Sequence, residues 1–210
     1  MEHLQRRFDP SECTSIMETK SRLLSYLKQK KGAWVSGEYL SGHLQVTRSA
    51  VWKQVRRLRE EGYVIRSSPR KGYLLLGAPE LLLPHEIREN LPCRSFGRQE
   101  IVYCRETEST NSKAKELAAK GAPEGTLVVA EAQTGGRGRR GRTWYSPSGE
   151  GIYATVILRP RLSLTEAPKI TFMAAVAAAE ALMGEGGLEV SIKWPHDVIA
   201  GGKKIAGILV

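Results

Sequence analysis

The sequence contains few cysteines and no long apolar run, and these two absences limit the class of protein. Cys13, Cys93 and Cys104 are odd in number and far apart, so neither a disulfide framework nor a CxxC metal site is predicted, and no metal-ligating residue is assigned. No apolar run reaches the roughly 18 residues of a spanning helix, and the charged N-terminus lacks the apolar segment of a secretory signal. We therefore expect a cytoplasmic protein without a membrane partner.

The net charge of +10 lies almost entirely in one segment of the chain. Residues 16–77 contain 13 Lys and Arg against 4 Asp and Glu, whereas the rest of the chain contains 19 against 18. A charge that only served solubility would be spread more evenly. This concentration favours a module that binds a polyanion.

The basic segment has the element order of a winged helix-turn-helix. The predicted elements are helices over 16–31, 38–44 and 47–60, with Thr47 as N-cap of the third, and a β-hairpin over 63–76. In the third helix, Val51, Val55 and Leu58 form the expected buried stripe. The opposite side is basic, as a helix that reads bases in the major groove requires.

The residues expected to contact duplex DNA lie on the third helix and on the hairpin, which can reach the flanking backbone. They are Arg48, Ser49, Lys53 and Arg56 on the helix, and Arg66, Arg70 and Lys71 on the hairpin. The alternative is a small protein-interaction domain with a solvated basic face.

The remainder of the chain divides into a tail, a linker and a larger domain. Residues 1–15 are expected to be a flexible tail, 78–95 a proline-punctuated linker with a short helix, and 96–210 a domain of strands and helices. Within it, strands are predicted over 101–105, 127–132, 151–158 and 188–194, helices over 111–120 and 165–182, and a hairpin over 198–210. We therefore expect an α+β fold.

Residues 133–142 form the most unusual segment, with four arginines in six positions among glycines. The spacing matches neither a P-loop nor a dinucleotide-binding fingerprint. Glycine lets the backbone approach a ligand closely, and arginine forks match phosphate oxygens. We predict a flexible, anion-binding loop. The alternative, a nucleic-acid-binding tail of RGG type, is less favoured because strands are predicted on both sides.

Four motifs in order resemble those of the biotin protein ligases. They are Ser109-Thr110-Asn111, the run from Gln133 through the arginines to Trp144, Lys193-Trp194-Pro195-His196-Asp197, and Lys204 to Leu209. Together with the winged helix they are most similar to the bacterial bifunctional type, which represses the biotin operon. The resemblance covers residues 16–210 and implies a mixed-sheet catalytic domain of the biotin/lipoate ligase type.

The resemblance implies a two-step reaction. Biotin and ATP, with Mg²⁺, give biotinyl-5′-AMP, and the biotin then passes to a lysine of a carboxylase's biotin carboxyl carrier domain. Duplex operator DNA is the other implied partner, and a homodimer is implied when ligand is bound. Two other functions stay open: a lipoate-type ligase, and a regulator that senses biotin or biotinyl-AMP without catalysis.

The resemblance also implies roles for individual residues. Lys204 and Arg139 are the implied catalytic residues. The implied biotin-binding residues are Ser109, Thr110, Asn111, Gln133, Arg137, Gly138, Arg139 and Lys204, and the implied ATP or adenylate residues are Arg142, Trp144, Lys193 and Asp197.

Two departures from the family pattern accompany the resemblance. His196 stands where the family usually has Asn. Family members also continue beyond the sequence that ends at Val210, so the catalytic domain is expected to be incomplete here. Because side chains alternate along a strand, we expect Lys204 to face the ligand and Lys203 to face solvent.

Overall fold

A computed structural model describes residues 10–210 except 31, 94 and 164. The chain divides into two compact units, Met1–Leu81 and Leu82–Val210. The division falls within the segment 78–95 that the sequence predicts as a linker. Each unit is described by itself.

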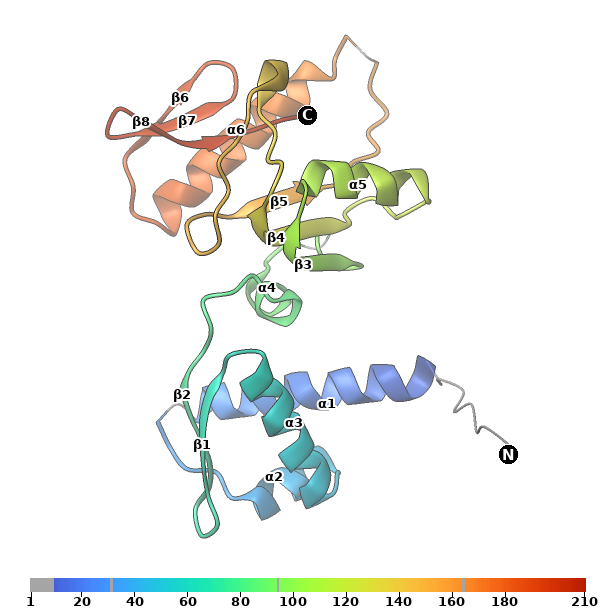
Figure 1. Cartoon of the computed structure of the whole chain (residues 1–210), viewed down its shortest axis with the longest axis vertical. Coiled ribbons are helices and arrows are strands. Elements are labelled where there is room, and N and C mark those ends of the chain that lie inside the picture. The colour runs from blue at the N-terminus through green and yellow to red at the C-terminus, as the bar shows by residue number, and fades with distance from the viewer. Residues whose placement is uncertain (1–9, 31, 94, 164) are drawn as a thin grey trace. The chain divides into compact units, whose positions relative to one another are not determined.

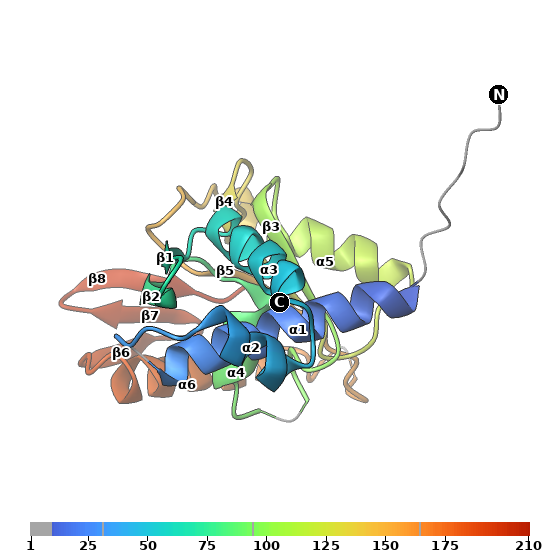
Figure 2. The ribbon, with the colours of Figure 1, turned by 90° about the horizontal axis from the view of Figure 1, so that it is seen from below.

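The first unit is a winged helix-turn-helix, as the sequence predicts (Figure 1). Its elements are α1 (Pro10–Gln29), α2 (Gly37–Leu44), α3 (Arg48–Glu60), β1 (Val64–Ser68) and β2 (Gly72–Gly77). The three helices pack on one another (Figure 2). Leucines and valines spaced at helical intervals form the core, with Leu23, Leu27, Leu40, Val51 and Leu58 all buried.

Helix α1 begins within the segment 1–15 that the sequence predicts as a flexible tail. Residues 10–15 are helical, six residues before the predicted start at Ile16. Pro10 suits the first position of a helix, because its fixed φ is helical and the amide hydrogen it lacks would have no partner there. Residues 1–9 of the expected tail lie outside the described residues.

The two shorter helices begin at polar N-caps. Ser36 accepts a hydrogen bond from the amide of Tyr39 at 3.0 Å, and Thr47 accepts one from the amide of Ala50 at 3.2 Å. These bonds satisfy amides that have no partner within the helix. Gln45, in the left-handed region at φ 55°, ends α2 and starts the turn into α3.

The second unit combines helices with two sheets. Its elements are α4 (Pro84–Asn90), β3 (Ile101–Thr107), α5 (Thr110–Ala119), β4 (Leu127–Gln133), the 3₁₀ turn η1 (Arg139–Gly141), β5 (Tyr153–Val156), α6 (Pro168–Gly184), β6 (Val190–Lys193), β7 (Asp197–Ala200) and β8 (Lys203–Gly207). Strands β3 and β4 are parallel and β5 is antiparallel to β4, whereas β6, β7 and β8 form an antiparallel sheet. The mixed-sheet α+β fold is confirmed.

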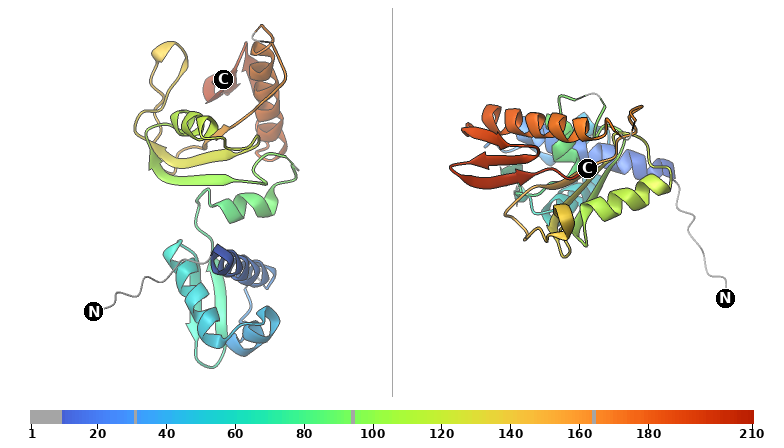
Figure 3. Two further views of the ribbon diagram at one scale, coloured as in Figure 1. Left: turned by 90° about the vertical axis from the view of Figure 1, so that its right-hand side faces the viewer. Right: turned by 90° about the horizontal axis from the view of Figure 1, so that it is seen from above.

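The helices of this unit cover the sheets. Helix α5 packs on β4 and β5, while α4 contacts β3 from the other side of that sheet (Figure 3). Helix α6 packs against β6 and β7. The core beneath α5 contains Ala114, Val128 and Ile157.

Several element boundaries differ from the prediction, and two of them lie beside the cavity described below. Helix α6 begins at Pro168 instead of Thr165, because proline is well placed in a first helical turn. Strand β8 ends at Gly207, so residues 208–210 do not continue the predicted strand. The amide of Ile208 instead donates to the carbonyl of His196 at 3.2 Å.

Candidate functional site

A cavity of about 490 Å³ in the second unit collects most of the predicted ligand residues. Those that line it are Thr110, Asn111, Gln133, Arg137, Gly138, Arg139, Trp144 and Lys204. Ser109, Arg142, Lys193 and Asp197 do not line it. The apolar part of the wall includes Ile152 and Ile170.

One end of the cavity is a closed hydrogen-bond network. The amide and hydroxyl of Thr110 both donate to Gln133 Oε1, at 2.8 and 3.2 Å, and Gln133 Nε2 donates to Ser146 Oγ at 3.0 Å. The hydroxyl of Thr155 lies 2.9 Å from Thr110 Oγ1 and 3.2 Å from Asn111 Oδ1. Thr110 begins α5 shortly after β3 ends, and Gln133 is the last residue of β4. The parallel pairing of β3 and β4 therefore brings the two together.

Ser109 is placed differently from its neighbours. It is 1% exposed and is the N-cap residue of α5, but its side chain accepts no capping hydrogen bond. Its Oγ has no hydrogen-bond partner among the described residues. Ser109 therefore occupies the N-cap position without making the side-chain hydrogen bond that serine commonly makes there.

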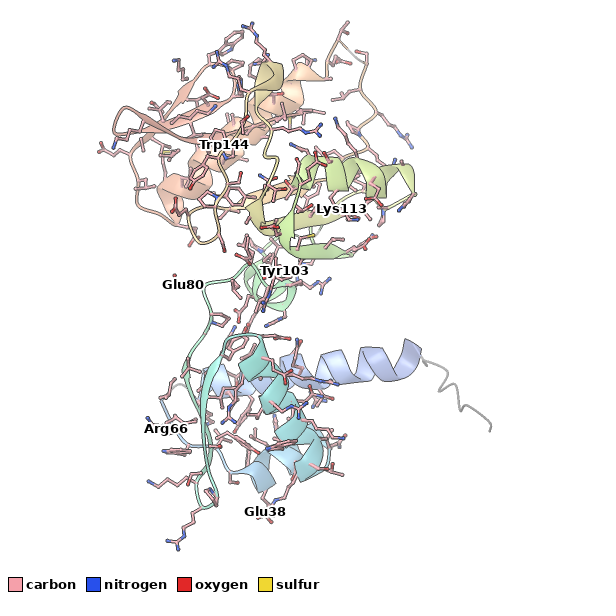
Figure 4. All side chains as sticks on the ribbon, in the orientation of Figure 1. Glu38, Arg66, Glu80, Tyr103, Lys113 and Trp144 are labelled. Atoms are coloured by element: carbon pink, nitrogen blue, oxygen red, sulfur yellow. The ribbon has the colours of Figure 1, made fainter. Side chains whose placement is uncertain are left out.

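The other end of the cavity is cationic. Lys204 Nζ lies 2.7 Å from Asp197 Oδ1 and 5.0 Å from the centre of the Trp144 ring, which Figure 4 marks. A Cβ on Gly207 would lie 3.0 Å from Lys204 Cε and 3.6 Å from the Trp144 ring, so glycine leaves the room that both need. The hydrogen bond from Lys204 lowers the pKa of the Asp197 carboxyl, and partial burial opposes this effect. Lys203 is exposed.

Residues 133–142, here called the arginine loop, have a defined local conformation. Arg137 pairs with Glu108 at 2.9 Å, and the amide of Gly138 donates to the carbonyl of Arg142 at 2.7 Å. Arg139 Nη1 lies 3.0 Å from His196 Nδ1. A Cβ on Gly136 would lie 2.6 Å from Ser146 Oγ, so only glycine fits there. Two of the four guanidinium groups therefore have partners within the loop's surroundings.

Several residues of the site were not found from the sequence. Ser146 and Thr155 complete the polar network, and His196, noted only as a departure from a motif, contacts Arg139. Isolated serines and threonines near a loop or in a strand carry no sequence signal. Phe172 and Trp194, with ring centres 5.8 Å apart, border a second cavity of about 610 Å³ that shares Arg139 with the first.

The predicted DNA-contacting residues of α3 are exposed. Arg56 pairs with Glu60 at 3.2 Å and lies over the ring of Trp52, with its Cζ 5.6 Å from the ring centre. Arg48 pairs with Glu38 of α2 at 3.3 Å. Ser49 and Lys53 are exposed on the same helix. The basic face expected from the sequence is thus present.

The hairpin presents Arg66, Arg70 and Lys71 to solvent (Figure 4 labels Arg66). Lys71 Nζ lies 5.9 Å from the centre of the Trp34 ring. Arg59 of α3 donates to the carbonyl of Ile65 at 2.7 Å and thereby ties the hairpin to the helix.

Two further features are absent from the described part of the chain. No three His, Cys, Asp or Glu side chains there are grouped so as to hold a metal. None of the helices found there is long and apolar enough to cross a membrane.

Comparisons with known proteins match both parts of the chain. The model of the biotin/lipoate A/B protein ligase family matches residues 103–210, and that of an HTH domain matches residues 19–74. The chain belongs to the biotin/lipoate A/B protein ligase family. The family model therefore includes β3 to β8 and both ends of the cavity.

Relatives of this ligase family member combine the same two parts. The chain is 42% identical over 187 residues to the bifunctional ligase/repressor BirA of Bacillus subtilis, covering 89% of this chain and 57% of the relative. It is 32% identical over 179 residues to the protein of that name from Escherichia coli, covering 85% and 54%. The biotin protein ligase from Aquifex aeolicus in complex with biotin and ATP aligns with a TM-score of 0.45 at 33% identity, covering 53% of this chain and 46% of that one. The chain thus spans about half the length of these proteins.

Proposed function

We propose that this chain is part of a bifunctional biotin protein ligase and biotin-responsive repressor. In this proposal the second unit joins biotin and ATP into biotinyl-5′-AMP and passes the biotin to a lysine of a carboxyl carrier domain. The first unit binds duplex operator DNA. The observation that carries the proposal is the cavity that has an amide and hydroxyl network at one end and Lys204 at the other, with Arg137 and Arg139 also in its wall.

The two ends suit the two parts of biotin. Its ureido ring both donates and accepts hydrogen bonds. The side chain of Asn111 and the hydroxyl and amide groups around Gln133 can supply the complementary donors and acceptors. The apolar wall suits the valeryl chain. The carboxylate is then directed toward Lys204 and the arginines, where the α-phosphate of ATP would also lie.

The chemistry of the first step requires positive charge. A biotin carboxylate oxygen attacks the α-phosphorus of ATP, the bond from that phosphorus to the bridging oxygen of the β-phosphate breaks, and pyrophosphate leaves with the electron pair. Because two anions approach each other, cations placed in advance lower the barrier. We assign this role to Lys204 and Arg139, with Trp144, Arg142, Lys193 and Asp197 on the nucleotide side.

In the second step the carrier's lysine amine attacks the biotinyl carbonyl. An amide bond forms, the bond from the carbonyl carbon to the phosphate oxygen breaks, AMP leaves and the amine loses a proton. Until then the mixed anhydride must be kept from water. We propose that the arginine loop, with Arg137 and Gly138 at the cavity wall, covers the intermediate.

Mg²⁺ is included in the proposal as a companion of ATP. Among the described residues, two carboxylates lie beside side chains of the cavity wall, but Glu108 already pairs with Arg137 and Asp197 already pairs with Lys204. They do not fit a dedicated magnesium site, and no step of the proposed reaction depends on one.

The homodimer that we propose for the ligand-bound form is testable by sedimentation with and without biotinyl-5′-AMP. The cytoplasmic location stays a prediction.

The test is to supply this chain with ATP, biotin and a purified carrier domain. Biotin-dependent pyrophosphate release with label transfer supports the ligase. Binding of biotinyl-AMP without transfer would instead favour a sensing regulator, the alternative left open by the sequence. Lipoate that competes equally with biotin would favour the lipoate-type ligase, and binding of none of these ligands would refute the proposal.

A further inference from the structure

The contact between Arg139 and His196 is not used by the proposed function. It joins the arginine loop to the segment that precedes β7, two parts of the chain 57 residues apart. The imidazole is largely buried, with 14% of its side chain exposed. Both residues line the cavity of about 490 Å³, and Arg139 also borders the neighbouring cavity with Phe172 and Trp194. Arg139 is therefore part of the wall that the two cavities share, together with Ile208, Leu209 and Val210.

The contact defines which nitrogen of the imidazole carries the proton. An arginine guanidinium stays protonated and can only donate. His196 Nδ1, 3.0 Å from Arg139 Nη1, must therefore accept and bear no proton. A neutral imidazole then carries its proton on Nε2, which lies 3.2 Å from Asp197 Oδ1. The carboxylate is on the side where that proton is favourable.

We propose that neutral His196 is a positioning residue that holds Arg139 against the cavity, and that protonation of its Nδ1 releases the arginine. The proposal rests on the proposed function for its ligand, biotinyl-5′-AMP, but not for the contact itself. In the imidazolium both ring nitrogens are donors. Nδ1–H would then face an Arg139 N–H, and two like charges would meet at hydrogen-bond distance.

The charged groups around the imidazole come from four elements. Arg139 of η1 opposes its protonation, and Asp197 of β7 favours it. Lys204 of β8 already pairs with Asp197 at 2.7 Å, and Lys193 of β6 also acts on that carboxylate, so the carboxylate is largely compensated. The side chains that α6 brings to the cavity, Ile170 among them, are apolar.

The function that follows is a pH-dependent hold on the intermediate. The arginine would be held while the imidazole is neutral and released once the imidazole is protonated. A released Arg139 would leave the wall that the two cavities share, and bound biotinyl-adenylate would dissociate faster.

The first experiment needs no ligand. The 210-residue chain, with ¹⁵N-labelled histidines, is titrated by NMR, and the signals of His196 are assigned from those missing in His196→Asn. We expect the tautomer protonated on Nε2 at pH 8. A proton on Nδ1 at that pH would overturn the proposal, whatever the protein's activity.

The second experiment uses a non-hydrolysable biotinyl-adenylate analogue, with its affinity measured by calorimetry at pH 8 and pH 5.5. His196→Asn is the matched variant, because its amide oxygen accepts a hydrogen bond and does not titrate. We expect the wild-type affinity to fall roughly tenfold between these pH values, as for loss of one hydrogen bond to a charged group. His196→Asn should stay nearly constant, and His196→Ala should be weak at both.

The two experiments separate the possible failures. Parallel pH profiles of the wild type and His196→Asn would show that another group titrates, and would overturn the positioning role. If no variant binds the analogue, the proposed function fails while the NMR result still decides the Arg139–His196 contact.

Discussion

Lys204 Nζ lies 2.7 Å from Asp197 Oδ1, across the pair of strands β7 and β8. The carboxylate holds one side of the ammonium, and the face of Trp144 holds another. The ammonium of Lys204 is thereby held at the wall of the cavity, although most of strand β8 is exposed. An anion that enters the cavity meets a cation that is already in position.

Replacement of Lys204 by Met should weaken binding of a non-hydrolysable biotinyl-adenylate analogue by roughly 10-fold to 100-fold, the usual range for a hydrogen bond to a charged group. Lys203→Met is the matched control, because Lys203 is exposed and does not line the cavity. It should bind within about threefold of wild type, a change below 1 kcal/mol. Calorimetry gives both values, and equal losses in the two variants would contradict the assignment of Lys204.

The same ion pair should make folding of the second unit depend on pH. The pKa of Asp197 is lowered in the folded state, so the folded carboxylate binds protons less readily than the unfolded one. The stabilisation is thus complete above the ordinary carboxyl range and is lost as pH falls through the lowered folded value. In urea unfolding at pH 7, the free energy of unfolding of the wild type should exceed that of Asp197→Asn. The difference between the two should decrease toward pH 3.

The control for that titration is Glu116, whose pKa is lowered to about 2 by Lys120 and Lys113 on the surface of α5. Because solvent screens these exposed pairs, Glu116→Gln should change the free energy of unfolding less than Asp197→Asn does at pH 7. A gap between wild type and Asp197→Asn that does not change with pH would rule out the linkage.

On the DNA side, Lys53→Ala and Arg56→Ala should each cost roughly 1–3 kcal/mol of operator binding if the side chain reads a base. Lys71→Ala on the hairpin should weaken binding to all duplexes alike and reduce its dependence on salt, as loss of a phosphate contact does. Fluorescence anisotropy with operator and random duplexes at several salt concentrations measures both. Binding that does not vary with salt would argue against this interface.

Gly72 should be far less replaceable than Gly32. Both have a positive φ, 92° and 78°. A Cβ on Gly72 would overlap the backbone of Val35, whereas nothing lies within 4 Å of one on Gly32. Gly32→Ala should cost about 1–2 kcal/mol for the backbone conformation alone. Gly72→Ala should cost more than about 3 kcal/mol. Thermal unfolding of the first unit measures both losses of stability. Similar losses in the two variants would contradict the close approach of Gly72 to the backbone of Val35.

The periodicity of apolar residues and the helix caps determined most of the first unit. Val51, Val55 and Leu58 repeat at helical spacing, and Thr47 supplies an oxygen where free amides need one, so local chemistry was sufficient. The start of α1 was missed because the residues before Ile16 show no apolar stripe, and only Pro10 marked the beginning.

In the second unit the motifs identified which residues belong together, but not how they meet. That Gln133 binds Thr110 follows from the parallel pairing of β3 with β4, and that Lys204 reaches Asp197 follows from the register of β7 with β8. Contacts between distant segments depend on strand order and register, which no local pattern contains. The contact of His196 with Arg139, which are 57 residues apart in the sequence, was therefore decided by the tertiary structure alone.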